Sequence, residues 1–150
     1  MGIKYSGRLL VSGLLRSLQQ AIISALPDWA NSTQQTRLQA SDAAANDYFG
    51  WSVSISSDGN TAIVGAYSDN NSGGTDAGSA YVFTRSGGVW TQQTRLQASD
   101  AAASDLFGYS VNISSDGNTA IVGAYSDTNS GGADAGSVLC DLQEVEGFGL

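Results

Sequence analysis

The sequence has no histidine, one cysteine and one proline. Without histidine, Ser-His and Cys-His catalytic pairs and mixed Cys/His metal sites are excluded. The lone Cys140 cannot form a disulfide within the chain, so a disulfide framework is excluded and the redox compartment stays undetermined. We interpret Cys140 as incidental, since no base accompanies it to make a nucleophile.

Positive charge is scarce over most of the chain. Lys4, Arg8 and Arg16 lie within residues 1–27, which contain no acid, whereas residues 28–150 carry all 14 acidic residues against three arginines. Nucleic acid is therefore not expected as a partner, because phosphate binding needs a basic surface. Cations or cationic partners are favoured instead.

The chain consists largely of one sequence written twice. Residues 33–79 and 91–137 are 58 positions apart, and 41 of their 47 aligned positions are identical. A fixed period of this size indicates a supersecondary unit that stacks on its neighbours. We expect an N-terminal segment of residues 1–30, a repeat region of residues 31–138 with two units, and a non-repeat tail of residues 139–150.

Each unit contains four strand signals. Apolar residues alternate with small polar ones over residues 49–56, and residues 61–67 form a short apolar run typical of a strand buried on both faces. Residues 78–85 and the more polar residues 89–98 follow, the last as a solvent-facing outer strand. Asp58-Gly59 predicts a two-residue type I′ turn between the first two strands. We expect the following residues to be buried: Phe49, Val53, Ile55, Ile63 and Val64.

Four antiparallel strands graded from apolar to polar are typical of one blade of a β-propeller. The spaced FG and VGA elements, with Asp-Gly between them and GSAYVF after them, resemble the FG-GAP repeat of integrin α-chain propellers, and the full phrasing is similar to its bacterial-type branch. The resemblance covers residues 33–137. It implies an all-β chain of tandem four-stranded antiparallel blades. One polar strand at residues 31–40, one full blade and a second that loses its repeat after Ser137 make an incomplete propeller.

Residues 8–26 show the pattern of an amphipathic helix that ends before Pro27. We favour a helix packed on the repeat or peripheral to it. The alternatives are a secretory signal, a membrane span and N-myristoylation at Gly2. Arg16 within the apolar run argues against the signal, Gln19 and Gln20 argue against the span, and the shortness of the motif argues against myristoylation. Membrane contact is expected only through residues 1–27.

Integrin-type repeats usually hold calcium between FG and GAP, but the corresponding loop here has Asp58 as its one charged ligand, so we predict a plain turn. A second loop is richer in oxygen ligands. Asp69, Asn71 and Asp76, repeated as Asp127, Asn129 and Asp134, are candidate calcium ligands. The alternative, which we favour, is that Asx and Gly residues simply stabilise a long turn.

The topology of a blade places eight aspartates on one face of the repeat region: Asp42, Asp47, Asp69, Asp76, Asp100, Asp105, Asp127 and Asp134. Bound cations or a cationic partner would relieve their repulsion, and solvation at physiological salt would also tolerate it. The aromatic residues Tyr48, Trp51, Tyr67, Tyr81, Phe83 and Trp90 are expected in the core between units.

These observations favour a non-catalytic module for binding or adhesion, with a protein or glycan ligand or other repeat-containing chains as partners and calcium as the candidate cofactor. The resemblance implies an extracellular or cell-surface location and a longer parent propeller. A truncated structural fragment without its own activity is the main alternative. An Asp-dependent glycoside hydrolase is a distant one, because paired carboxylates on glycine-rich loops lack rigid support.

Overall fold

The computed structural model describes Leu18 and residues 36–142. Residues from Leu38 onward belong to one compact unit, and the description below concerns this unit alone. The predicted helix over residues 8–26 lies outside the described residues, apart from Leu18. In the part of the chain that the structure describes, no helix has the length and apolar character needed to cross a membrane.

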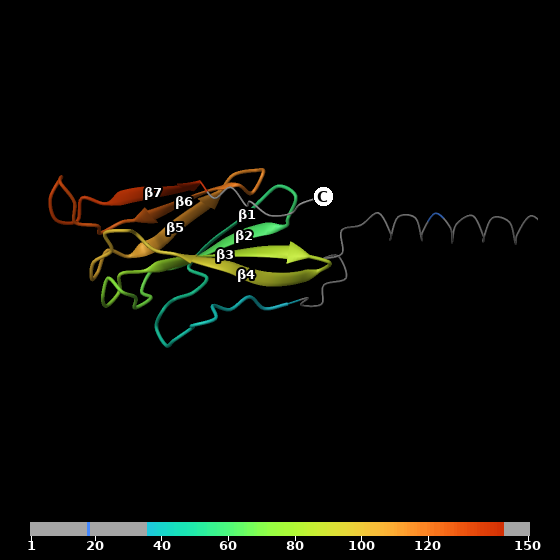
Figure 1. The fold of residues 1–150 in the computed structure, drawn as a ribbon, viewed down its shortest axis with the longest axis horizontal. Helices are drawn as coiled ribbons and strands as arrows, with labels where there is room; N and C mark the ends of the chain where they lie inside the picture. The colour runs from blue at the N-terminus through green and yellow to red at the C-terminus, as the bar shows by residue number, and fades with distance from the viewer. Residues whose placement is uncertain (1–17, 19–35, 143–150) are drawn as a thin grey trace, which may run out of the picture. The chain divides into compact units, whose positions relative to one another are not determined.

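The unit consists of two antiparallel sheets (Figure 1). The first sheet has the order β1-β2-β3-β4, formed by Ser52–Ile55, Thr61–Ala66, Ser79–Ser86 and Val89–Leu96. The second has the order β5-β6-β7, formed by Phe107–Ile113, Thr119–Ala124 and Ser137–Leu142. This confirms the all-β prediction with one antiparallel sheet for each repeat. The duplicated sequence ends at Ser137, yet β7 continues to Leu142 by pairing with β6.

The β1–β2 hairpin forms as predicted, but its turn differs from the predicted type. Four residues separate Ser56 from Thr61, whose backbone groups are hydrogen bonded at 2.9 Å, and the Gly59 N–H donates to the Ser56 carbonyl. Gly59 has a φ of 69°, whereas Asp58 is absent from the positive-φ residues. A type I′ turn needs positive φ at both positions, so that prediction is wrong. The β5–β6 hairpin repeats this geometry at Gly117.

The two sheets pack face to face. In Figure 1 the first sheet lies below the second, and β5 is next to β1 and β2. We call the surface of the first sheet that contacts the second its downstream face; it carries Ile63, Ala80 and Val82. The opposite surface of each sheet is its upstream face, which carries Val53 and Ile55 in the first sheet and Val111 and Ile113 in the second. A common core joins the first sheet's downstream face to the second sheet's upstream face.

Glycine permits a close approach of backbones where the sheets meet. A Cβ atom at Gly65 of β2 would overlap the carbonyl oxygen of Gly108 on β5, and one at Gly108 would overlap the Ser79 carbonyl. Gly108 also has a φ of 89°, which side-chain-bearing residues rarely adopt. The glycine of the second FG pair therefore sets how tightly the sheets pack.

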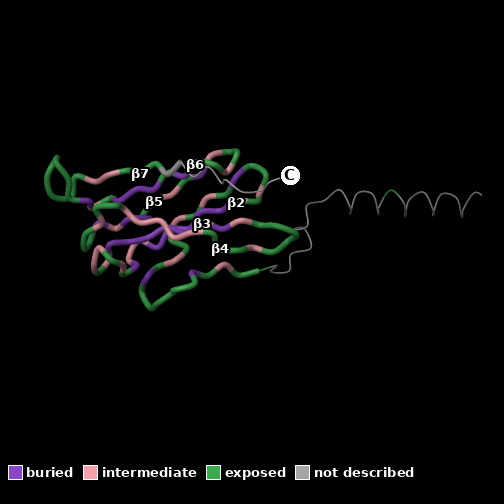
Figure 2. Tube along the Cα trace, in the orientation of Figure 1, coloured by how far each residue is buried: buried purple, intermediate pink, exposed green. Residues whose placement is uncertain are grey.

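The prediction of buried residues was correct for β2 and wrong for β1. Ile63 and Val64 are 0% and 4% exposed, whereas Val53 and Ile55 are 67% and 56% exposed. The alternation in β1 is real, but its apolar side is the upstream face, against which the described residues place no second sheet. Figure 2 shows buried stretches along the central strands and exposed ones in the loops and turns.

The polar strand predicted at residues 31–40 is not observed where the chain is described. Residues 36–40 contain no strand, and Leu38 is half-buried while Ala40 is buried. Both pack on the upstream side of the first sheet, with Val64, Ala66 and Tyr81. The corresponding residues of the second unit form part of β4, which pairs with β3. The difference is one of available strand edges, since the sequence is the same.

Candidate functional site

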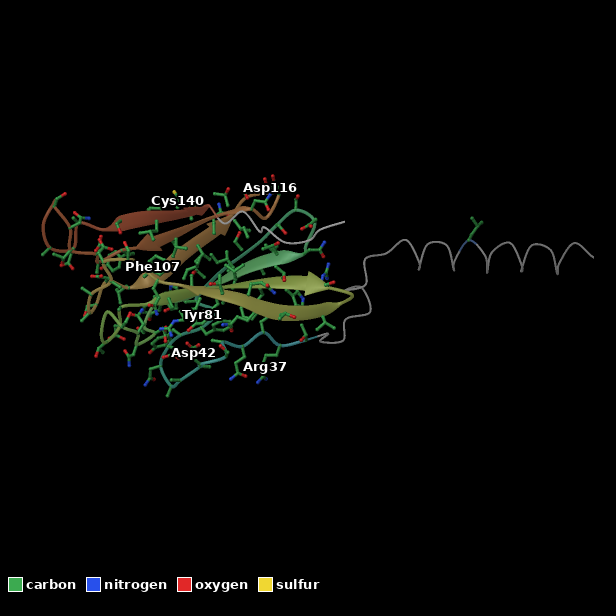
Figure 3. All side chains as sticks on the ribbon, in the orientation of Figure 1. Arg37, Asp42, Tyr81, Phe107, Asp116 and Cys140 are labelled. Carbon is green, nitrogen blue, oxygen red and sulfur yellow. The ribbon has the colours of Figure 1, made fainter. Side chains whose placement is uncertain are left out.

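Connecting loops gather at one end of the two sheets, opposite the hairpin turns that contain Asp58 and Asp116 (Figures 1 and 3). This arrangement agrees with the prediction that the eight aspartates of the connecting loops lie on one face of the repeat region. At the loop end, however, Asp47, Asp69, Asp105 and Asp127 are buried. Buried carboxylates need partners, so these four residues do not form a free acidic surface.

Asp47 and Asp105 stabilise the loops that enter each unit. Asp47 accepts a hydrogen bond from the backbone N–H of Ala44, and Asp105 accepts one from Ala102. The two residues are equivalent in the repeat, so both units use the same side chain to close the same turn. Their carboxylates therefore have a structural role.

An arginine joins two other aspartates in the first sheet. Arg95, on β4, contacts Asp42 at 2.7 Å and Asp69 at 2.8 Å, and its Nε donates to Ser79 Oγ at 3.0 Å. Asp69 also accepts a hydrogen bond from the Tyr81 hydroxyl at 3.3 Å. Burial, followed by the negative charge of Asp69, raises the pKa of Tyr81 above its ordinary value. The outer strand thus neutralises the buried Asp69.

Asp127, the counterpart of Asp69, has a different environment. It is 6% exposed, and Asn129 Nδ2 donates to it at 3.4 Å. Within residues 36–142 no arginine or lysine forms an ion pair with Asp127, and Leu139 replaces Tyr81. The second sheet therefore holds a buried carboxylate without the cation that its counterpart has.

The candidate calcium loops are organised by their own hydrogen bonds. Asn71 Nδ2 donates to the Gly78 carbonyl at 2.6 Å, and its Oδ1 accepts from Gly73 N–H at 2.7 Å. Asn129 repeats both bonds in the second unit. Asp76 and Asp134 adopt φ values of 54° and 52°. Among the described residues, no three acidic or cysteine side chains are grouped as a metal site. Calcium binding by these loops stays a prediction.

The loop end also carries a row of aromatic side chains that crosses from one sheet to the other. Tyr48 stacks on Tyr67 with ring centroids 5.3 Å apart, and Trp51 contacts Tyr67 at 5.0 Å. Tyr67 contacts Tyr109 at 5.5 Å, and Tyr109 contacts Tyr125 at 5.1 Å. We call these five residues the aromatic row. Each ring lies within the distance range of favourable aromatic pairs.

The aromatic row is exposed although its rings contact one another. Tyr48, Trp51 and Tyr125 are 53%, 54% and 61% exposed, and Tyr109 is 39% exposed. Trp51 directly precedes β1, and Tyr67 and Tyr125 directly follow β2 and β6. The repeat generates the row, because Trp51 and Tyr109 are equivalent positions, as are Tyr67 and Tyr125. A surface of this kind is unusual unless it contacts something.

Tyr81 and Phe83 are buried, at 1% and 3% exposed, but on the upstream side of the first sheet and not in the core between the two sheets, whereas Tyr48 and Trp51 are exposed. The predicted place in the core between units is therefore wrong for these four residues. Tyr48 and Trp51 lie in the loop before β1, which begins at Ser52 and not at residue 49, where the predicted alternation begins. A sequence signal existed: positions 51 and 109 are both aromatic although the residue type differs, and positions 67 and 125 are both Tyr. Their place at strand ends could have indicated a surface at the loop end.

The fold is that of a repeat protein in which each unit forms an antiparallel sheet that packs on the next. The sequence profile of the FG-GAP repeat matches residues 32–83 and 90–139, which is more than half of the chain. The chain therefore belongs to the FG-GAP repeat family. A comparison with curated proteins finds no match.

Proposed function

We propose that this chain is a non-catalytic binding or adhesion module of a β-propeller, and that the aromatic row contacts its ligand. The observation that carries the proposal is the exposure of Trp51, Tyr109 and Tyr125 in one continuous row. Tyr and Trp are enriched where proteins bind partners, because they offer a large rigid surface with a polar tip. Membership of the FG-GAP family supports a binding role.

The ligand of the proposed site is a protein or a glycan. A flat ring can stack on the C–H face of a sugar or on an apolar side chain, and the tyrosine hydroxyls can bind polar groups beside it. The row contains no charged side chain. The proposed location is extracellular or at the cell surface, in agreement with the usual setting of FG-GAP repeats.

The test uses arrays of immobilised oligosaccharides and purified extracellular proteins, probed with the full chain. Trp51→Ala and Tyr109→Ala remove the centre of the row, and we expect each to weaken binding by about tenfold or more, as at other aromatic hot spots. Val89→Ala is the matched control, since Val89 is 66% exposed on another part of the sheet. Binding that survives the double variant unchanged would contradict the proposed site.

Calcium assistance is a separate proposal with its own test. If the loops of residues 69–76 and 127–134 bind calcium, millimolar calcium raises the melting temperature, and Asp69→Ala combined with Asp127→Ala abolishes the rise. The single variants are informative as well, because Asp69 already forms an ion pair with Arg95, whereas no arginine among the described residues pairs with Asp127. A melting curve that calcium leaves unmoved would support the turn interpretation alone.

A further inference from the structure

Equivalent faces of the two sheets have opposite exposure. Val53 and Ile55 are exposed on the upstream face of the first sheet, whereas their counterparts Val111 and Ile113 are covered by the first sheet. On the downstream faces the order reverses. Ile121 and Val138 of the second sheet are 40% and 64% exposed, and their counterparts Ile63 and Ala80 are both 0% exposed. Each open face therefore has a covered copy within the same chain.

The backbone hydrogen bonds that join the units follow the same pattern. The N–H groups of Ser104, Leu106 and Phe107 donate to the carbonyls of Thr75, Asp76 and Ala77, at 2.9, 3.2 and 3.0 Å. The counterparts of these donors are Asn46, Tyr48 and Phe49, and the counterparts of the acceptors are Ala133, Asp134 and Ala135. Neither set makes these bonds within the described residues. Three donors at one end of the unit match three acceptors at the other.

Gly50, the glycine of the first FG pair, also lacks the close neighbour that its counterpart has. A Cβ atom at Gly108 would overlap the Ser79 carbonyl of the first sheet, whereas one at Gly50 would meet no atom within 4 Å. Gly50 and Gly108 are equivalent and have similar φ values of 92° and 89°. The backbone at Gly50 is thus shaped for a close neighbour that the described residues do not supply.

The outer strand supplies a further match. β4 pairs with β3 and brings Arg95 to Asp69. Within the described residues no strand pairs with the corresponding edge of β7. Residues 36–40 have the same sequence as residues 94–98, TRLQA, and contain no strand. Leu38 and Ala40 pack on the first sheet's upstream side, as Leu96 and Ala98 pack in the core between the sheets.

We infer that two copies of this chain dock head to tail, so that the downstream face of the second sheet in one copy packs on the upstream face of the first sheet in the next copy. Residues 36–40 of the second copy then add to β7 as its fourth strand, and Arg37 of that copy binds the buried Asp127. Each of these contacts repeats one that already exists within a single chain, either between its two sheets or between β4 and the rest of the first sheet. The inference does not depend on the proposed ligand site.

The contact joins two different surfaces, so a dimer leaves one copy of each surface free. Assembly then continues until a ring closes. Each copy contributes the equivalent of two blades, and propellers close with about four to eight, so a closed ring contains about two to four copies.

Complementing variants test the docking. Val53→Arg places a charge on the upstream face and Val138→Arg places one on the downstream face, while each leaves the other face intact. Sedimentation of the full chain is expected to show assemblies for the wild type, monomers for each variant alone and 1:1 dimers for their mixture. Val89→Arg, equally exposed but on the first sheet's downstream side and so outside both docking faces, is expected to assemble like the wild type.

A wild-type chain that stays monomeric at high micromolar concentration would overturn the inference, and so would a mixture of the two variants that stays monomeric. Dimer formation in the mixture also shows that both variants fold. Assembly of Val53→Arg on its own would indicate a different interface and would equally overturn it.

Two further measurements address the contacts themselves. Cys140 is exposed on the downstream face, so its reaction with a thiol reagent is expected to slow severalfold as the chain assembles. We expect Arg37→Glu, introduced into the Val138→Arg chain that supplies residues 36–40, to raise the dissociation constant of the variant pair at least tenfold. Arg37→Glu in the Val53→Arg chain, whose residues 36–40 lie outside the contact of the variant pair, is the control for net charge. An equal effect of the substitution in either chain would contradict the pairing of Arg37 with Asp127.

Discussion

The first and second sheets are built from nearly the same sequence but lie in different surroundings. β2 is buried along most of its length, with Ile63 fully covered, whereas the equivalent Ile121 in β6 is 40% exposed. Asp69 binds an arginine, and among described residues Asp127 does not. Because local sequence is held constant, these differences arise from the neighbours of each sheet. Burial in this protein is thus decided between units.

Comparing Gly65→Ala with Gly123→Ala tests the difference between the two sheets most directly. At Gly65 the new Cβ overlaps the Gly108 backbone, whereas at Gly123 it meets the Ser110 side chain, which can rotate. We expect Gly65→Ala to lower the free energy of unfolding by about 3 kcal/mol and Gly123→Ala by less than about 1 kcal/mol. Urea unfolding at a concentration that keeps the chain monomeric measures both. Equal losses would show that the sheets do not pack as described.

Arg95→Met places Asp69 in the situation of Asp127. Removing one partner of a buried ion pair typically costs about 3–5 kcal/mol. The Arg95 side chain is 26% exposed and Asp42 is 39% exposed, so solvent screening reduces the expected loss to about 2 kcal/mol. Asp127→Asn is the matched control, with an expected change below about 1 kcal/mol, both measured by urea unfolding. A larger effect at Asp127 would reverse the assignment of the stabilising pair.

Tyr81 introduces a pH dependence that its counterpart Leu139 cannot have. Its pKa is raised in the folded state above the ordinary value of 10.0, because burial and Asp69 disfavour the phenolate. The contribution of Tyr81 to stability is therefore fully present below pH 10 and is lost as pH rises beyond it. We expect Tyr81→Phe to flatten the fall in melting temperature above pH 10. A fall that persists unchanged would assign it to other groups.

The hairpin turns give the smallest expected effect, and here the two sheets should agree. Hydrogen bonds from the Ser56 hydroxyl and from Asn60 lower the pKa of Asp58, and the same bonds from Ser114 and Asn118 lower that of Asp116. A carboxyl group whose pKa is lower in the folded state than in the unfolded state stabilises the fold at pH values above its unfolded pKa. This stabilisation is lost as the pH falls through the folded pKa.

We therefore expect Asp58→Asn and Asp116→Asn to lower the stability slightly near pH 7. Between pH 5 and about pH 2 the stability of each variant is expected to fall less than that of the wild type. Thermal melts across this range measure the effect. Unequal effects of the two substitutions would show that these turns, like the faces of the sheets, respond to their neighbours.

Several elements were predictable because they depend on residues close in sequence. The alternation in residues 49–56, the apolar run in residues 61–67 and the Asp-Gly turns located the hairpins correctly. The turn type was missed because the Asp58 carboxylate binds Ser56 and Asn60, which stabilises a longer turn with positive φ at Gly59 alone. Local pattern located the turn, and side-chain hydrogen bonding decided its geometry.

The site was less predictable. The candidate ligands Asp69 and Asp127 read identically in sequence, yet only β4, paired across the sheet, brings Arg95 to one of them. Likewise Trp51 and Tyr109 form one row with Tyr67 because the two sheets stack. Neither contact follows from spacing along the chain.

The sequence by itself determined the repeat, the antiparallel strands and the FG-GAP family, since periodicity and turn residues act over a few positions. Only the tertiary structure decided which apolar face of each sheet is covered, because alternation defines two faces without saying which of them meets a neighbour. Val53 and Val111 have nearly the same neighbours in sequence, which differ at Trp51/Tyr109 and Ser54/Asn112. One is exposed and the other is packed against the first sheet, because in the described part of the chain only the second has a sheet beside its upstream face.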